Sequence, residues 1–504
     1  MIWATAIPAV TGFECHLKGT RPDEALRGCH VRVIAALVLT ITAGGCASRA
    51  SVPAVSSVAA RDEAAGALIR RGCYRCLEQA YEHAQVRGMR QEAFEAAALL
   101  ALRSKELGLP SHVWFERARG LGGADPSRSP YLEMVDVIPP DRLSENRDAL
   151  FDIGRRNRAR GSLERWREQL SVGGGSEAFR MYLDVSLICA FGTLKETADS
   201  FSGAVVPVAS TPLFQYAIGA CDVTHRTRLT ALRTSEPEFV DADYHLGRYA
   251  LEDPLNPDIE EGLRRFESAA GAFPGSPAIA TRIGNIHRLW EEWEPALVAY
   301  DAALRVAPDH PEGTIGRAIS LSHLGRSEEA IGTATRLIEG GQWLLGEAYY
   351  WRAWNQLRLN NFQPARTDAD RARTLMSNAA VLVLSGVIEW RLGRLQSAAK
   401  DFEGALVVDL GECDAAFNLG VVRDELRQLP EALAAFKQSG QCYDLSITLR
   451  REAIEKIRGG HGSETLKARD SARHERLLAD LIERRHEVTR LVESIEKVGF
   501  ARQP

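Results

Sequence analysis

A small residue returns about every 34 positions through the second half of this 504-residue chain. The first series is Gly262, Ala296, Ala330, Ala365, Ala398 and Ala432, at intervals of 34, 34, 35, 33 and 34. Four residues after each of these stand Phe266, Tyr300, Ala334, Ala369, Phe402 and Phe436. A second series of small residues precedes them, at Gly247, Gly284, Ala318, Ala353, Gly386 and Gly420. A pattern that returns so regularly leaves the chain few choices of fold.

The pattern predicts pairs of antiparallel helices. Glycine inside a helix costs about 1 kcal/mol relative to alanine, so its return at one register requires a packing reason. Two helices approach closely only where small residues face each other, and the larger residue one turn later fills the gap between neighbouring hairpins. Proline, as at Pro308, ends the second helix of a unit. We therefore predict six helical hairpins over residues 241–445, stacked into an all-α solenoid.

The period and the residue sizes resemble the tetratricopeptide repeat family. The resemblance implies a right-handed α-solenoid whose first helices line a concave face, where an extended peptide or a partner helix can lie. The repeat register places ten candidate partner-binding residues on that face: Asn285, Arg288, His323, Tyr350, Trp351, Trp354, Arg358, Trp390, Arg391 and Phe417. Alternatively, the aromatic residues among them fill space opposite the alanine-rich second helices.

The same resemblance bears on the expected ligand. Chaperone-binding members of the family hold a C-terminal carboxylate with a Lys/Asn/Arg clamp. Two of the clamp positions are occupied here by Thr281 and Gly316. An acidic C-terminal peptide is therefore not the expected partner.

The segments on either side of the repeats are also expected to be helical. Residues 62–125 fit divergent hairpins of the same type, and residues 126–240 an irregular helical region broken by "VIPPD" and "SVGGGS". Residues 446–504 are predicted as C-terminal capping helices, including one long amphipathic helix over 464–499. A coiled-coil contact with a partner is the alternative role of that helix.

The N-terminal part has the features of a bacterial lipoprotein signal. Its apolar run "VIAALVLTITA", residues 33–43, is shorter than the roughly 20 residues that a membrane-spanning helix needs. The following "AGGC" resembles a lipobox, which implies removal of residues 1–45 and lipidation of Cys46. We expect residues 46–61 to be a flexible tether, and residues 1–30 not to be translated, with the true start at Val31. Because Ala47 follows the lipidated cysteine, the resemblance implies an outer-membrane lipoprotein that faces the periplasm.

Six cysteines follow the lipidation site, and an even number permits disulfides in an oxidising compartment. Their spacing suggests the pairs Cys73–Cys76, Cys189–Cys221 and Cys413–Cys442, although the sequence leaves the connectivity open. "CYRC" also matches half of a zinc site or a redox motif, but neither a second pair nor a βαβ pattern accompanies it.

Composition and motifs favour binding over catalysis. A net charge of −5 provides no general basic surface for nucleic acid. The sequence contains no phosphate loop, dinucleotide glycine motif, His-Glu-x-x-His or nucleophile elbow. We expect no enzyme, no cofactor and no metal, and predict a lipid-anchored scaffold for protein–protein contacts in the bacterial cell envelope. Two alternatives are a glycan-capturing outer-membrane lipoprotein and a soluble adaptor of the same repeat type.

Overall fold

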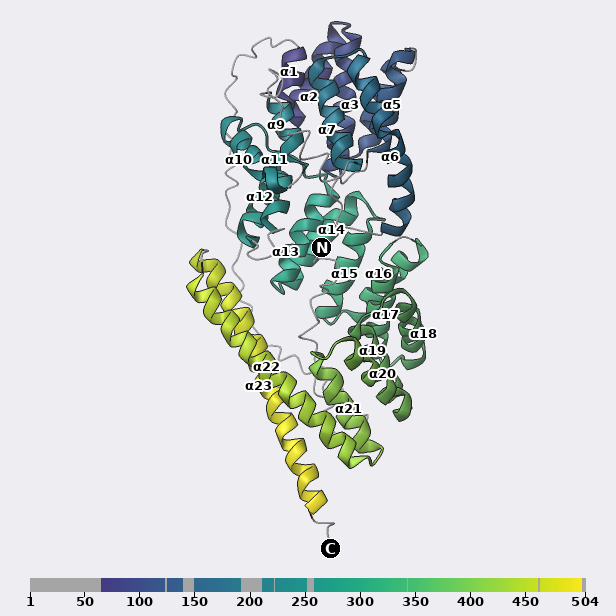
Figure 1. Cartoon of the computed structure of the whole chain (residues 1–504), viewed down its shortest axis with the longest axis vertical. Helices are drawn as coiled ribbons and strands as arrows, with labels where there is room; N and C mark the ends of the chain where they lie inside the picture. Colours follow the sequence, from purple (N-terminus) through teal and green to yellow (C-terminus); the bar gives the residue numbers. More distant parts are fainter. Residues whose placement is uncertain are drawn as a thin grey trace, which may run out of the picture.

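The computed structural model describes residues 65–122, 125–138, 149–191, 211–221, 223–251, 258–341, 343–460 and 463–500. Every regular element in these ranges is a helix. The helices stack into one elongated body, with α1 near one end and α21 to α23 at the other (Figure 1). The predicted all-α solenoid is confirmed. None of the helices in these ranges combines the length and the apolarity that a membrane span requires.

An N-terminal group of helices forms the first part of this body. Its α-helices are α1 (Ala65–Arg71), α2 (Tyr74–Val86), α3 (Arg90–Glu106), α4 (Ser111–Gly122), α5 (Ser129–Val137), α6 (Ala149–Val172), α7 (Glu177–Phe191), α9 (Pro212–Gly219) and α10 (Arg226–Ser235). Two 3-10 helices, η1 (Pro126–Arg128) and η3 (Val223–His225), join them. Helix α3 contacts both α2 and α4 and is buried almost all round, because its apolar residues point in every direction. The predicted signal, the tether and Cys46 lie outside the described residues.

Charged side chains buried in this N-terminal group are matched by partners. Arg103 forms an ion pair with Asp241. Glu106 accepts hydrogen bonds from the hydroxyl groups of Tyr182 and Tyr216, both at 2.9 Å. Since a buried charge without a partner is strongly destabilising, this network ties α3 firmly to the segment just before the first repeat.

Six helix pairs follow in the described part of the chain. They are α11 (Ala242–Leu251) with α12 (Ile259–Ala272), α13 (Pro277–Leu289) with α14 (Trp293–Val306), α15 (Pro311–His323) with α16 (Ser327–Glu339), α17 (Leu345–Arg358) with α18 (Phe362–Leu375), α19 (Ala379–Arg391) with α20 (Leu395–Val408), and α21 (Cys413–Glu425) with α22 (Leu429–Gly459). The two helices of each pair pack against each other. The array is thus built from one repeated supersecondary unit.

Glycine allows the two helices of a pair to touch. A Cβ atom built on Gly386 would lie 2.6 Å from Cε1 of Phe402, so this ring packs directly on the glycine backbone. Tyr300 lies between Gly284 of its own pair and Gly316 of the next pair. The aromatic residue of the repeat therefore packs within its own pair and also joins it to its neighbour.

The turn inside a pair repeats as well. Gly325 and Gly393 have positive φ values of 76° and 74°. The equivalent residues of other pairs, Glu291, Asn360 and Arg427, have φ values of 61°, 62° and 62°. A left-handed conformation costs a residue such as Glu291 or Arg427 about 1–2 kcal/mol, whereas asparagine adopts it more readily. Packing of the helix pair therefore imposes this turn even where the local sequence does not favour it.

Helix α22 extends well beyond the last repeat. It runs unbroken from Leu429 to Gly459, so the expected boundary at residue 445 falls inside a helix. Helix α23 (Glu464–Phe500) folds back along α22, which confirms the predicted C-terminal amphipathic helix. We call residues 446–500 the C-terminal hairpin. Figure 1 shows it as a long arm beside the repeats.

Candidate functional site

The first helices of the repeats lie on one side of the solenoid. Helix α13 contacts α15, α15 contacts α17, α17 contacts α19, and α19 contacts α21. Second helices such as α16 and α18 lie on the side away from the C-terminal hairpin (Figure 1). We call the side formed by α13, α15, α17, α19 and α21 the inner face.

The ten candidate partner-binding residues divide into two groups by burial. Six are half-buried: Asn285, Arg288, His323, Trp354, Arg358 and Arg391. Four are buried, with exposed fractions of 8%, 7%, 4% and 1%: Tyr350, Trp351, Trp390 and Phe417. The second group fills space between helices, which is the alternative that the sequence left open for the aromatic residues.

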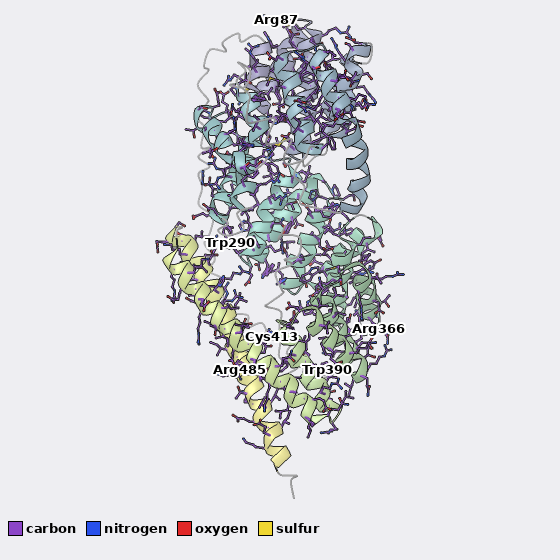
Figure 2. The ribbon with its side chains drawn as sticks, in the orientation of Figure 1. Arg87, Trp290, Arg366, Trp390, Cys413 and Arg485 are labelled. Carbon is purple, nitrogen blue, oxygen red and sulfur yellow. A yellow bond between two sulfur atoms is a disulfide. The ribbon has the colours of Figure 1, made fainter. Side chains whose placement is uncertain are left out.

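Two of these buried aromatic residues show how the C-terminal end of the inner face is covered. Phe417 packs against Phe436 with ring centroids 5.8 Å apart, in a cluster that includes Val488 of α23. Trp390, labelled in Figure 2, donates its indole N–H to Oε1 of Glu425 at 3.1 Å. Their contacts are made inside the protein, so neither ring offers a face to a partner.

An aromatic stack lies further toward the N-terminal end of the inner face. The rings of His323 and Trp293 are 3.6 Å apart and nearly parallel, at an angle of 22°. Trp351 lies beside them, with its centroid 5.8 Å from that of His323. Sequence reasoning missed Trp293, because it begins a second helix, which the repeat pattern assigns to the other side. The two tryptophans of "WEEW", residues 290–293, were the signal that could have drawn attention to this turn.

Positive charge flanks this stack. Burial lowers the pKa of His323, and the guanidinium groups of Arg288 and Arg358 act in the same direction, so that the pKa is about 3. The imidazole is therefore neutral at pH 7. The three residues stand 35 positions apart on α13, α15 and α17, at one register of the repeat. Arg391 continues the row on α19 and donates to Oδ1 of Asn360 at 3.1 Å.

The tip of the C-terminal hairpin contacts the second repeat. Arg473 pairs with Glu291 at 3.0 Å, and Arg469 pairs with Glu292 at 3.3 Å. The Arg469 guanidinium also lies 4.2 Å from the ring centroid of Trp290, which Figure 2 labels near the hairpin tip. These contacts join segments that are far apart in the sequence, so the repeat pattern carried no signal for them.

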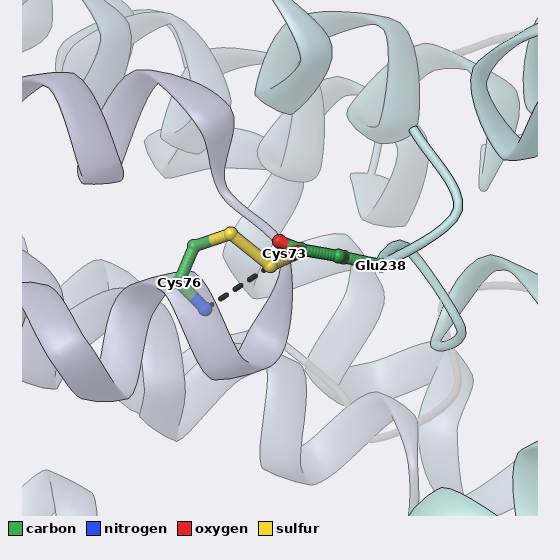
Figure 3. A group of neighbouring side chains, drawn as sticks. All are labelled: Cys73, Cys76 and Glu238. Atoms are coloured by element: carbon green, nitrogen blue, oxygen red, sulfur yellow. Dashed lines mark hydrogen bonds between the residues drawn. A yellow bond between two sulfur atoms is a disulfide. The ribbon is translucent and has the colours of Figure 1, made fainter. Parts of the chain in front are cut away.

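The described residues contain three disulfides, Cys73–Cys76, Cys189–Cys221 and Cys413–Cys442. The cysteine spacing suggests the same pairs. Figure 3 shows the first disulfide beside Glu238, whose carboxylate pairs with Arg71 at 3.0 Å. Two thiolates and a carboxylate are metal ligands, but here the two sulfur atoms are bonded to each other. This group therefore acts as a crosslink at the start of α2.

No known protein family and no curated protein matches the chain by sequence. Solved structures do match it. YrrB, a TPR protein with an unusual peptide-binding site, is 21% identical with a TM-score of 0.30, over 35% of this chain and 91% of that chain. PilW, a type IV pilus biogenesis factor, is 14% identical with a TM-score of 0.37, over 40% of this chain and 91% of that chain. A chain of the APC/C hetero-tetramer Cut9-Hcn1 is 13% identical with a TM-score of 0.36, over 85% of this chain and 91% of that chain.

Likenesses at this level carry neither a partner nor a pathway to this chain. The class of the protein follows from its own repeat register, helix pairs and glycine contacts. The chain is a helical-repeat solenoid of the tetratricopeptide type. Its inner face presents a half-buried aromatic stack between two arginines.

Proposed function

We propose that this protein is a scaffold that holds segments of partner proteins on its inner face during assembly of complexes in the bacterial envelope. The observation that carries the proposal is the half-buried row of Arg288, His323 and Arg358 on three neighbouring helices. Tryptophan and arginine are enriched at binding hot spots, and both types meet here, because Trp293 stacks on His323 between the two arginines. A rigid row of this kind suits a protein segment that crosses the helices.

A binding role is favoured over a catalytic one. The network of Arg103, Asp241 and Glu106 is 0%, 1% and 6% exposed, so a substrate cannot reach it. His323 is more accessible, but a general base works best with a pKa near the working pH. With a pKa of about 3, the His323 imidazole is a weak base.

The lipid anchor and the periplasmic location are part of the same proposal. They are supported by the short apolar run, by "AGGC" before the small-residue tether, and by three disulfides that suit an oxidising compartment. Cells fed labelled palmitate should incorporate label into the parent protein and lose it in Cys46→Ala. Absence of label from the parent protein would favour a soluble adaptor.

Photo-crosslinking tests the scaffold role. A photoreactive residue at Asn285, half-buried on the inner face, should crosslink to partner proteins in intact envelopes. Val298 is the control position, because it is 68% exposed on the second helix α14. Equal crosslinking from both positions, or crosslinking from Val298 alone, would place partner binding elsewhere.

A glycan-binding role finds less support in the inner face. Aromatic sugar platforms need open ring faces, whereas Trp351 and Trp390 are only 7% and 4% exposed. A polysaccharide affinity gel tests this alternative. Retardation of the protein that disappears in the Trp351→Ala, Trp354→Ala double variant would reverse the preference.

A further inference from the structure

Several other half-buried arginines in the repeats are paired with carboxylates. The distances are 2.6 Å for Arg265 with Asp243, 2.7 Å for Arg317 with Asp301, and 2.7 Å for Arg352 with Asp368. The physical reason is that a cation held partly out of water loses hydration, and a carboxylate compensates for that loss. These pairs set the pattern against which the inner-face arginines can be compared.

Arg288 and Arg358 do not follow this pattern. Both are half-buried, but within the described residues no carboxylate lies at ion-pair distance from either guanidinium. Arg358 donates Nη1–H to the carbonyl oxygen of Ser322 at 2.6 Å, and Arg288 lies beside the hydroxyl of Tyr300. Nε of Arg288 is enclosed without a hydrogen-bond partner in this part of the chain. Both arginines thus keep positive charge available on the inner face.

Aromatic side chains lie between these arginines. His323 stands between them on α15, is neutral at pH 7, and stacks on Trp293. Trp354, half-buried on α17, adds a further apolar side chain. Neighbouring helices lie about 8–10 Å apart, so the two steps from α13 to α17 make about 16–20 Å. An extended chain advances about 3.3 Å per residue, so about five or six residues span from one arginine to the other.

We propose that α13, α15 and α17 bind an extended protein segment in which acidic side chains flank an apolar side chain. The carboxylates pair with Arg288 and Arg358, and the apolar side chain lies against the stack of His323 and Trp293. This inference rests on the proposed scaffold function and names the chemistry of its partner. Because the arginines face side-chain carboxylates, a segment with an amidated C-terminus should bind as well as one with a free C-terminus.

Selection from a displayed library of random linear peptides on the full-length protein tests the proposal. The enriched peptides should carry Asp or Glu on both sides of an apolar residue. Affinity of an enriched peptide, synthesised with both ends blocked, should fall at least about tenfold in the Arg288→Gln, Arg358→Gln double variant, because charge-assisted pairs are lost. The affinity should also weaken as salt is raised.

The Arg305→Gln, Arg336→Gln double variant is the matched control. Both arginines are exposed on the second helices α14 and α16, so this variant loses the same charge away from the inner face. It should bind the enriched peptide as the parent protein does, and both double variants should melt like the parent. Enrichment of peptides without acidic residues, or equal losses in the two variants, would overturn the anion site and leave the scaffold function standing. Failure to enrich any peptide would count against both.

Discussion

Replacing Gly386 with alanine should destabilise the fifth helix pair, although alanine is the better helix former. The added Cβ would lie 2.6 Å from Cε1 of Phe402, and the Phe402 ring is 0% exposed, so it has no room to move aside. Overpacking of this kind costs about 1–3 kcal/mol. The gain from helix propensity is about 1 kcal/mol, so the net loss of stability should be up to about 2 kcal/mol.

Gly332→Ala is the matched control for this prediction. Gly332 is exposed within α16, and no atom of another part of the protein lies within 4 Å of a Cβ built there. This variant gains helix propensity without a clash and should be stabilised. Both variants gain the same helix propensity, so this contribution cancels when their changes in free energy of unfolding are compared. The remaining difference should be about 1–3 kcal/mol, with Gly386→Ala the less stable variant.

Native-state hydrogen exchange measures this difference locally, in the amides of α19 and α20 for Gly386 and of α16 for Gly332. A second substitution, Phe402→Leu in the Gly386→Ala background, removes the ring atom that clashes and should recover part of the loss. The reasoning fails if Gly386→Ala raises the exchange protection of its helix pair, relative to the parent protein, as much as Gly332→Ala raises that of α16. Glycine would then have no packing role at this register.

Three further predictions concern charged residues. Burial and two nearby aspartates raise the pKa of Glu412 from 4.5 to about 7, so the folded protein keeps this proton after the unfolded chain has released it. The free energy of unfolding should therefore fall by about 3 kcal/mol as the pH rises from 4.5 to about 7. Urea titrations across this pH range should show that Glu412→Gln removes the fall. Arg469→Glu with Arg473→Glu should release the tip of the C-terminal hairpin, and hydrogen exchange at the tip as slow as in the parent would contradict this. Arg103→Met should destabilise the protein by about 3–5 kcal/mol in thermal or urea unfolding, because Asp241 stays buried without its partner, and a loss below about 1 kcal/mol would contradict this role.

The repeats could be predicted because their signal is local. Gly386 and Phe402 lie 16 positions apart in one hairpin, so their sizes alone indicate that two helices meet there. The candidate site was harder to predict. Trp354 and Trp390 were assigned to the same face by the repeat register, but Trp354 is half-buried whereas Trp390 is 4% exposed and bonded to Glu425.

The C-terminal hairpin marks the limit of sequence reasoning on this chain. The apolar spacing of residues 464–499 predicts the helix α23, but nothing in that spacing says that Arg473 meets Glu291, 182 residues earlier. An ion pair between residues far apart in the sequence depends on how two helical elements are positioned in the folded protein. A local sequence pattern does not specify that position.

The helix pairs, their period and the spacing of Arg288, His323 and Arg358 can be read from the amino-acid sequence, because the helical spacing lies within one helix and the repeat lies within one hairpin. Which of these side chains are accessible, and which arginines lack a carboxylate partner within the described residues, depends on the tertiary structure. Accessibility depends on what packs over a residue. Phe417 is buried in a cluster that includes Val488 of α23, whereas the arginines flanking His323 remain half-buried.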